Sequence, residues 1–561
     1  MNEFESGNIW KHRVSRRRWL GGAGVVGLGT ASAALIGCGS QPAAEPKAAT
    51  PAAKASAPAA LTPQAAAKPK AGGELRVAVD NNPVSYDPHI EASYRTQWSV
   101  GGAYNRVLGL TTDLKITPEL AASWETPDNT TVVLKMQQGV KFHNVAPVNG
   151  RAFTAEDVVW SIQRIATNKP EFQRRYMFDA IDKITATDAN TVTIKLKTPF
   201  APLFGYLANP FTVVAPKEAL GEKGDLRTAV VGTGPFVFKS GQKGVAYKWE
   251  KNPAYWEKEM PYLDSYTLSV VPDAATRLAS LRAKQLDVEV VSPDQAASLK
   301  GDNSLVIESV AQGNNFTIRY NTTRAPFNDV RVRKAFDLVI DRKQIAQLVY
   351  GGGALPAGPI NPGLGAWAIS QEDLAKAPGY RADKAADVAE AKKLLEAAGQ
   401  TNFQFDYVYY TPAVEHEQVA QTAQQQLEKA GFKVKLTKMQ YAEWIPFTLE
   451  KKFMMTGTGS GFRDNPDEYL YALFHSSSSR NDTGYKNPEI DKLLEQSRSQ
   501  LKEDERKATV MDLQKRLMNE VPNSWITGGT LMEARSATLK GYVPTYTHNR
   551  PRQFVRAWFD K

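Results

Sequence analysis

The side chains that most often catalyse reactions or bind metals are few and widely spaced in this chain. Cys38 is the only cysteine among 561 residues, so no cysteine nucleophile or cysteine metal cluster is available in the 523 residues that follow it. The histidines beyond it stand far apart, at His89, His143, His416, His475 and His548. No HExxH, HxH or GxSxG pattern occurs, although zinc hydrolases and α/β-hydrolases depend on such spacings. We therefore expect no catalytic residue, no metal and no cofactor.

The chemistry of Cys38 is indicated by the residues before it. Leu35-Ile36-Gly37-Cys38 resembles a bacterial lipobox, in which the thiol receives a diacylglycerol and cleavage makes the cysteine the new N-terminus. A basic stretch with paired arginines at 15–20 (SRRRWL) and a Gly/Ala-rich apolar run precede it, as in a twin-arginine export signal. Residues 19–37 carry no charge and are long enough to span a bilayer, so an uncleaved membrane anchor is the alternative.

The segment after Cys38 has the composition of a tether. Residues 39–71 contain 14 alanines and 6 prolines, with Leu61 as the one large apolar side chain, which is too little to form a core. Residues 1–37 and 39–71 each carry a net charge of +3, so the body from Gly72 has only +4 of the total of +10. Without dense basic runs, this charge gives no support for nucleic-acid binding.

The body shows the alternation of strands and helices that is typical of an α/β protein. Short strands are predicted at 73–80, 131–136 and 191–196. Residues 154–160 are predicted to open a helix, with Thr154 as its N-cap. After Pro326 helical periodicity dominates 330–350, 383–398, 414–430, 488–500 and 502–519, with strands near 403–410 and 432–438. Residues 525–561 again have strand character. About 490 residues exceed a single core, so two lobes or more are expected.

Ten segments of the body, in order, match motifs of one protein family. They are 86–88 (YDP), 118–125 (PELAASWE), 139–143 (GVKFH), 153–158 (FTAEDV), 231–236 (VGTGPF), 252–256 (NPAYW), 261–264 (PYLD), 287–288 (DV), 326–335 (PFNDVRVRKA) and 340–342 (IDR). Together they resemble the extracytoplasmic solute-binding proteins of peptide and nickel ABC importers, known as family 5. The resemblance covers nearly all of the chain beyond the tether.

The resemblance implies an α/β fold of the large, type II periplasmic-binding-protein kind, with two hinged lobes, mixed sheets flanked by helices, and an inserted subdomain. It divides the chain into 1–37 (signal peptide), 38–71 (lipidated Cys38 and tether), 72–115 (lobe I, first part), 116–229 (inserted subdomain), 230–318 (lobe I, second part), 319–524 (lobe II) and 525–561 (lobe I, C-terminal part). The implied protein is a monomer anchored outside the cytoplasm, which delivers a small solute to an ABC permease and its ATPases.

The same resemblance supplies the candidate ligand-binding residues. Trp444 matches the aromatic residue of the family's x-Glu-Trp element, and Asp464 matches the carboxylate that holds a peptide's terminal amine. The spacing before the Pro-Asp-x-Tyr-Leu element is about two residues shorter here, so Asp464 reaches this place only through a deletion. Arg463 beside it favours an anionic group instead. Looser matches add Glu91 and Ser93 in the loop after Asp87-Pro88, and Tyr176; the full candidate set is Glu91, Ser93, Tyr176, Trp444, Arg463 and Asp464.

Other functions remain as alternatives to an oligopeptide receptor. One family hosts several ligands, so an oligosaccharide, an opine-like compound or a nickel chelate is the second hypothesis, and Trp98, Trp367 and Trp444 suit stacking against a sugar. A secreted hydrolase would need a Ser-His-Asp triad assembled from distant residues. A third alternative is an adhesive or chaperone-like surface lipoprotein without a transport partner.

Overall fold

The computed structural model describes residues 68–83, 85–90, 94–111, 114–226, 230–401, 403–411, 413–459, 465–544 and 553–561. The described residues form one unit. The predicted signal segment, Cys38 and most of the predicted tether lie outside the described residues.

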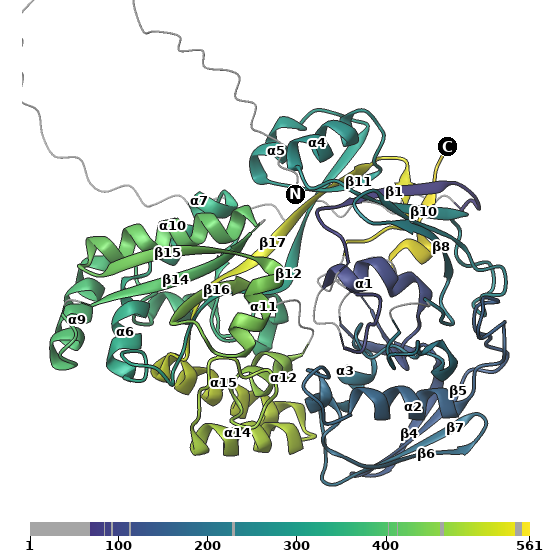
Figure 1. Cartoon of the computed structure of the whole chain (residues 1–561), viewed down its shortest axis with the longest axis horizontal. Coiled ribbons are helices and arrows are strands. Elements are labelled where there is room, and N and C mark those ends of the chain that lie inside the picture. Colours follow the sequence, from purple (N-terminus) through teal and green to yellow (C-terminus); the bar gives the residue numbers. More distant parts are fainter. Residues whose placement is uncertain are drawn as a thin grey trace, which may run out of the picture. The chain divides into compact units, whose positions relative to one another are not determined.

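A large mixed sheet organises the described part of the chain (Figure 1). Its strands follow the order β15 (Lys433–Gln440), β14 (Gln404–Thr411), β16 (Met455–Gly459), β12 (Leu305–Tyr320), β17 (Asn523–Ser536), β11 (Val288–Val291), β1 (Glu74–Val79), β10 (Ser265–Val270), β9 (Ala246–Lys251) and β8 (Phe236–Gln242), and β13 (Leu355–Pro356) also pairs with β17. Some neighbouring strands, such as β1 and β10 or β12 and β17, are far apart in sequence, so the sheet combines segments from both ends of the described chain.

Two long antiparallel strands, β12 and β17, join the two halves of this sheet. They pair from Leu305 with Ser536 to Arg319 with Asn523, with register shifts after Ala311 and after Phe316. The first part of β12 pairs with the part of β17 that also pairs with β11. The last residues of β12 pair with β16. Register shifts of this kind bend strands, so the two halves of the sheet meet at a bend.

The buried apolar side chains of the described residues form three clusters. One cluster combines apolar side chains from β1, β9 and β10 with those of a smaller sheet and of the helices between residues 466 and 520. The other lies under β12, β14, β15 and β16 and includes Phe316, Phe336 and Phe405. A third, small cluster lies beneath the helices of 274–298.

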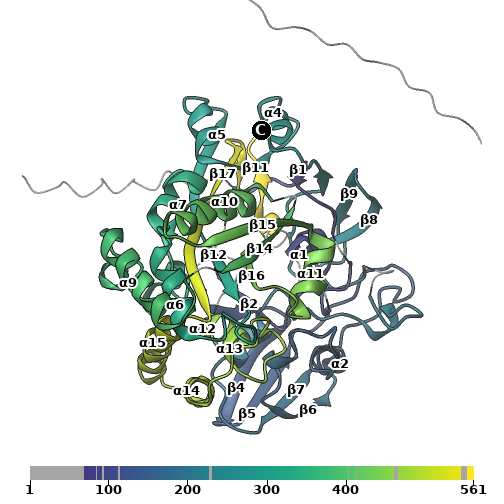
Figure 2. The same cartoon turned by 60° about the vertical axis from the view of Figure 1, so that its left-hand side comes forward.

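The smaller sheet has four strands in the order β4 (Ala121–Asp128), β5 (Thr131–Met136), β7 (Thr191–Leu196) and β6 (Ile181–Asp188). The helix α2 (Ala155–Ile165) packs on β6 and β7 (Figure 2). Thr154 and Asp157 form a capping box at its N-terminus, which satisfies two free backbone N–H groups. The predicted strands at 131–136 and 191–196 and the predicted N-cap are therefore confirmed.

The helices predicted from periodicity are present, together with others that the sequence analysis did not predict. They are α1 (Tyr94–Val100), α2, α3 (Leu203–Leu207), α4 (Ala274–Arg282), α5 (Pro293–Ser298), α6 (Val330–Val339), α7 (Arg342–Tyr350), α8 (Gln371–Lys376), α9 (Lys384–Ala397), α10 (Val414–Lys429), α11 (Tyr441–Leu449), α12 (Pro466–Tyr469), α13 (Tyr471–Phe474), α14 (Pro488–Ser499) and α15 (Glu503–Glu520). The predicted helical stretch 330–350 is divided in two. Ile340 has an extended backbone, and Asp341 caps α7 through the amide of Gln344, because an Asp side chain competes for backbone N–H groups.

The two short pairs β2 (Leu108–Leu110) with β3 (Ile116–Pro118), and β18 (Leu539–Lys540) with β19 (Trp558–Phe559), complete the strands that the structure describes. The last residues of the predicted tether are attached to the fold. Lys70 Nζ donates to Asp560 Oδ1 at 2.7 Å and to the carbonyl of Lys561 at 2.8 Å.

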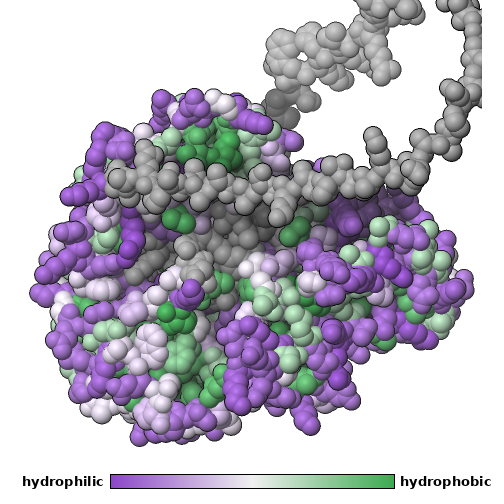
Figure 3. Space-filling view, turned by 180° about the vertical axis from the view of Figure 1, so that it is seen from behind, coloured by the Kyte–Doolittle hydropathy of each residue, from purple (hydrophilic) through white to green (hydrophobic). Residues whose placement is uncertain are grey.

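The surface in view is mainly hydrophilic, with apolar residues in small patches, one of them over the part that holds α4 and α5 (Figure 3). The strongly exposed large apolar side chains are spread along the sequence, at Val245, Leu348, Leu355, Leu449, Leu501 and Val543. None of the described helices combines the length and apolar character of a bilayer span.

The VGTGPF segment requires glycine for close packing. A Cβ atom at Gly234 would lie 2.4 Å from the carbonyl carbon of Ala103 and 2.6 Å from the backbone nitrogen of Tyr104. Backbone atoms yield less readily than the end of a flexible side chain, so a methyl group here would force the chain segments apart.

We expect Gly234→Ala to lower the free energy of unfolding by about 2 kcal/mol or more, because the added methyl group overlaps backbone on the facing segment. Urea titration measures the change. Gly358→Ala is the matched control, since a Cβ there meets its nearest neighbour at 3.5 Å, which is ordinary contact. Equal losses in the two variants would contradict the packing argument.

Two buried histidines make the fold sensitive to acid. His89 and His143 are almost completely buried, and their Nε2 atoms lie 2.8 and 2.9 Å from the carbonyls of Val213 and Gly234. Burial lowers the pKa of each imidazole from 6.5 to about 4. The folded protein therefore keeps them neutral while the unfolded chain binds protons below pH 6.5, and stability is lost as the pH falls from about 6.5 towards 4.

Each histidine should account for about 3 kcal/mol of lost unfolding free energy between pH 7 and pH 4. Urea titrations at pH 7, 5.5 and 4 measure this loss. In His143→Gln the side chain stays neutral at every pH, so its loss should be smaller than that of the parent by about one histidine's share. An identical pH dependence in both proteins would show that His143 is not responsible.

Candidate functional site

Three neighbouring parallel strands end at one edge of the large sheet. β14 pairs in parallel with β15 along its whole length and with β16 near its middle. Their last residues are Thr411, Gln440 and Gly459. In open α/β sheets ligands bind beyond the carboxyl ends of the strands. This edge is therefore the first place to look for a site, and α11, which carries Trp444, begins directly after β15.

Trp444 is held in a fixed position at this edge. Its side chain is buried, and the indole Nε1–H donates to Thr456 Oγ1 at 2.9 Å. Thr456 in turn donates to the carbonyl of Val408 at 2.9 Å, so the indole is tied to both β16 and β14. The indole N–H group therefore already has a hydrogen-bond partner within the protein.

An aromatic group that the sequence did not reveal surrounds Trp444. The ring of Tyr410 lies 4.8 Å from that of Trp444, 4.9 Å from that of Tyr441 and 4.0 Å from that of His416. The ring of His416 also lies 4.9 Å from that of Phe316 on β12. The run of aromatic residues at 407–410 was the available signal, but only the parallel pairing of β14, β15 and β16 brings these rings together.

A carboxyl group lies near the same edge, in the first turn of α10. Tyr350 donates its hydroxyl to Glu415 Oε1 at 2.7 Å. Burial raises the pKa of Glu415, although the Tyr350 hydrogen bond opposes the shift. The side chain therefore takes up a proton at a higher pH than an exposed glutamate.

Tyr176 belongs to a different group of side chains. It lies in the 3₁₀ turn Arg175–Met177 and is buried, with its ring 5.9 Å from that of Tyr206 and almost perpendicular to it. Its carbonyl accepts a hydrogen bond of 2.8 Å from Arg498 Nη2. Tyr176 therefore contacts Tyr206 and Arg498, whereas Trp444 packs with Tyr410 and Tyr441.

The other predicted site residues, Glu91, Ser93, Arg463 and Asp464, lie outside the described residues. Arg463 and Asp464 fall between two described positions, Gly459 at the end of β16 and Asn465, which caps α12. Their place in the sequence thus connects the sheet edge to α12.

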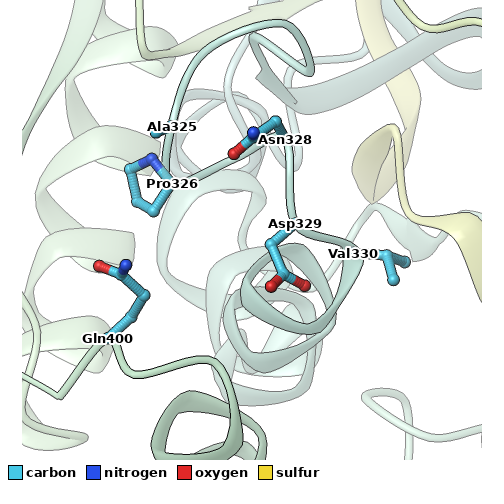
Figure 4. Close-up of a pocket in the computed structure, with 6 residues that line it drawn as sticks. All are labelled: Ala325, Pro326, Asn328, Asp329, Val330 and Gln400. Carbon is cyan, nitrogen blue, oxygen red and sulfur yellow. The ribbon is translucent and has the colours of Figure 1, made fainter.

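In the described part of the chain, no group of three or more His, Cys, Asp or Glu side chains is arranged to hold a metal ion. Figure 4 shows a surface pocket at the start of α6, lined by Ala325, Pro326, Asn328, Asp329, Val330 and Gln400. Asp329 caps α6 and pairs with Arg331 at 2.6 Å, so this carboxylate already has structural partners.

Comparisons with known proteins agree with this geometry. Residues 115–481 match the family model of bacterial extracellular solute-binding proteins, family 5. Similar curated proteins include the glutathione-binding protein GsiB of Pectobacterium atrosepticum, 29% identical over 83% of this chain and 90% of that protein. The di/tripeptide-binding protein 2 of Pseudomonas aeruginosa is 26% identical over 83% and 92%.

The fold has a close counterpart among solved structures. The periplasmic binding protein DppA of Helicobacter pylori, in complex with the peptide STSA, superposes with a TM-score of 0.79 over 88% of this chain and 99% of that chain, at 23% identity. The fold is therefore that of a two-lobed periplasmic binding protein, as the sequence predicts. Because the family model covers more than half of the sequence, the chain belongs to the bacterial extracellular solute-binding proteins of family 5.

Proposed function

We propose that this protein is the substrate-binding component of an ABC importer and captures a peptide, from dipeptide to oligopeptide, between its two lobes. The observation that carries the proposal is the match along almost the whole length of a di/tripeptide-binding protein and of a structure that holds a peptide. The aromatic group at the carboxyl edge of β14, β15 and β16 suits a ligand with varied side chains, since rings offer contact area without demanding one partner.

In this proposal Asp464 binds the terminal amine of the peptide, and Arg463 binds an anionic group. Trp444 contributes its ring surface. Glu91, Ser93 and Tyr176 complete the ligand contacts from the other side. A ligand that touches both lobes shifts the population towards the closed form by its differential affinity, and a few kcal/mol are enough. The protein binds without catalysis, and the ATPases of the importer supply the energy for transport.

The family is extracellular, and we propose that a twin-arginine signal at 1–37 exports this member and that a lipid on Cys38 anchors it to the membrane. The tether then separates a monomeric body from the membrane surface. The proposed lobe I comprises 72–115, 230–318 and 525–561, with 116–229 inserted into it, and 319–524 forms lobe II.

Asp464→Asn should weaken binding of a free-amine tripeptide by about 10- to 100-fold, because a charged hydrogen bond is lost. It should leave binding of the N-acetylated tripeptide nearly unchanged. Isothermal titration measures both. Asp512→Asn is the control, since Asp512 forms an exposed pair with Arg516 at 2.9 Å and should affect neither ligand. Equal weakening for both peptides would remove Asp464 from the amine site.

Mass spectrometry of compounds released from the denatured protein tests the ligand class directly. Short peptides support the proposal. A sugar or a metal chelate would overturn the peptide assignment while leaving the family unchanged.

A further inference from the structure

Three asparagines meet where β12 passes between β16 and β17. Asn361 Nδ2 donates to the backbone carbonyl of Asn314 at 3.0 Å and to Asn315 Oδ1 at 2.9 Å. Asn315 Nδ2 donates to the carbonyl of Gly358 at 3.1 Å. The backbone N–H of Gly363 donates to Asn361 Oδ1 at 2.8 Å. The carboxamides of Asn315 and Asn361 thus bind both donors and acceptors within the protein.

The carboxamide of Asn314 differs from the other two. Its Oδ1 atom is buried, yet the described part of the chain provides no hydrogen-bond partner for this atom. The residue as a whole is only half-buried, so the group lies at the boundary between protein and solvent. A buried acceptor without a partner costs free energy, and native proteins rarely keep one unless a function or a bound molecule accounts for it.

This unpaired group lies at the carboxyl edge of the sheet. Two residues further along β12, Phe316 pairs with Gly459, the last residue of β16. The ring of Phe316 lies 4.9 Å from that of His416, which belongs to the aromatic group of the candidate site. A Cβ atom at Gly459 would lie 2.9 Å from Asn314 Oδ1 and 3.0 Å from its Nδ2. The carboxamide therefore lies beside the end of β16, where ligands bind in open α/β sheets.

The backbone around Asn314 forms a bulge that holds the side chain in this place. After Ala311 the next residue of β12 that pairs with β17 is Asn315, so three residues of β12 lie opposite one of β17. Bulges redirect side chains and are frequent beside functional sites. The carbonyl of Gly313 accepts a hydrogen bond of 2.5 Å from the hydroxyl of Tyr469. Together with the bond to the Asn314 carbonyl, this contact fixes the backbone on both sides of the bulged residue.

A carboxamide held in this way is complementary to a peptide group. It has one oxygen acceptor and two N–H donors, and a peptide backbone presents an N–H donor and a carbonyl acceptor of the same kind. Such a contact does not involve the side chains of the ligand. It therefore suits a receptor for peptides of varied sequence.

We propose that Asn314 binds the backbone of the captured peptide, with its Oδ1 atom accepting a hydrogen bond from one internal N–H group. This inference rests on the proposed function, and it adds a ligand contact from β12 to those proposed for Trp444 and Asp464. Without ligand the unpaired acceptor lowers the stability of the protein, and the bound peptide satisfies it.

Ester analogues of trialanine test the proposal. In each of two analogues, an ester oxygen replaces one of the two internal N–H groups. In isothermal titration, the parent protein should bind one analogue about 3- to 10-fold more weakly than trialanine, because one hydrogen bond is lost. Asn314→Ala should bind trialanine about 3- to 10-fold more weakly than the parent does. It should no longer distinguish trialanine from that analogue, because the two changes remove the same interaction.

Asn328→Ala is the matched control, since Asn328 is an exposed asparagine in the surface pocket of Figure 4 and should keep the parent's affinities. If the parent binds trialanine and both analogues equally, or if the ester effect is the same in Asn314→Ala, the assignment of Asn314 is wrong while the proposed function stands. If the parent binds none of these peptides, the proposed function fails and this assignment fails with it.

The urea midpoint of the ligand-free protein separates a binding residue from a structural one. Asn314→Ala removes the unpaired acceptor, so its midpoint should equal or exceed that of the parent. Asn361→Ala removes a side chain with three hydrogen bonds, so its midpoint should fall. Asn314→Leu, which keeps a similar volume, replaces the alanine variant if that variant misfolds. A fall for Asn314→Ala as large as that for Asn361→Ala would show that the side chain is structural and would overturn the proposal.

Discussion

The pairing of β12 with β17 is the constraint on which the rest of the fold depends. These two strands cross from one half of the large sheet to the other, and their register shifts after Ala311 and Phe316. Every strand of the second half is joined to the first only through them. Register shifts bend the strands that contain them. The β12–β17 pair therefore joins the two halves of the sheet at a bend, which is a geometry that allows a hinge.

The candidate site follows from where this arrangement leaves the carboxyl ends of parallel strands. β14, β15 and β16 end together, and the aromatic rings of Tyr410, Tyr441 and Trp444 gather beside them. The Trp444 N–H donates to Thr456, so contacts within the protein set the orientation of the ring. In the proposed function this orientation reduces the entropy that binding must offset.

The sequence by itself determined the local structure and the family. A capping signal located the start of α2, and periodicity located α9, α10, α14 and α15 to within about two residues, because these features depend on neighbours along the chain. It also gave Trp444 as a candidate, although not the partners that orient it. Only the tertiary structure decided the strand order, the gathering of Tyr410 and His416 around Trp444, and the burial of Tyr176. Those features depend on interactions such as that between Tyr206 and Asp467, which are 261 residues apart, and no local pattern encodes which distant segment a side chain will meet.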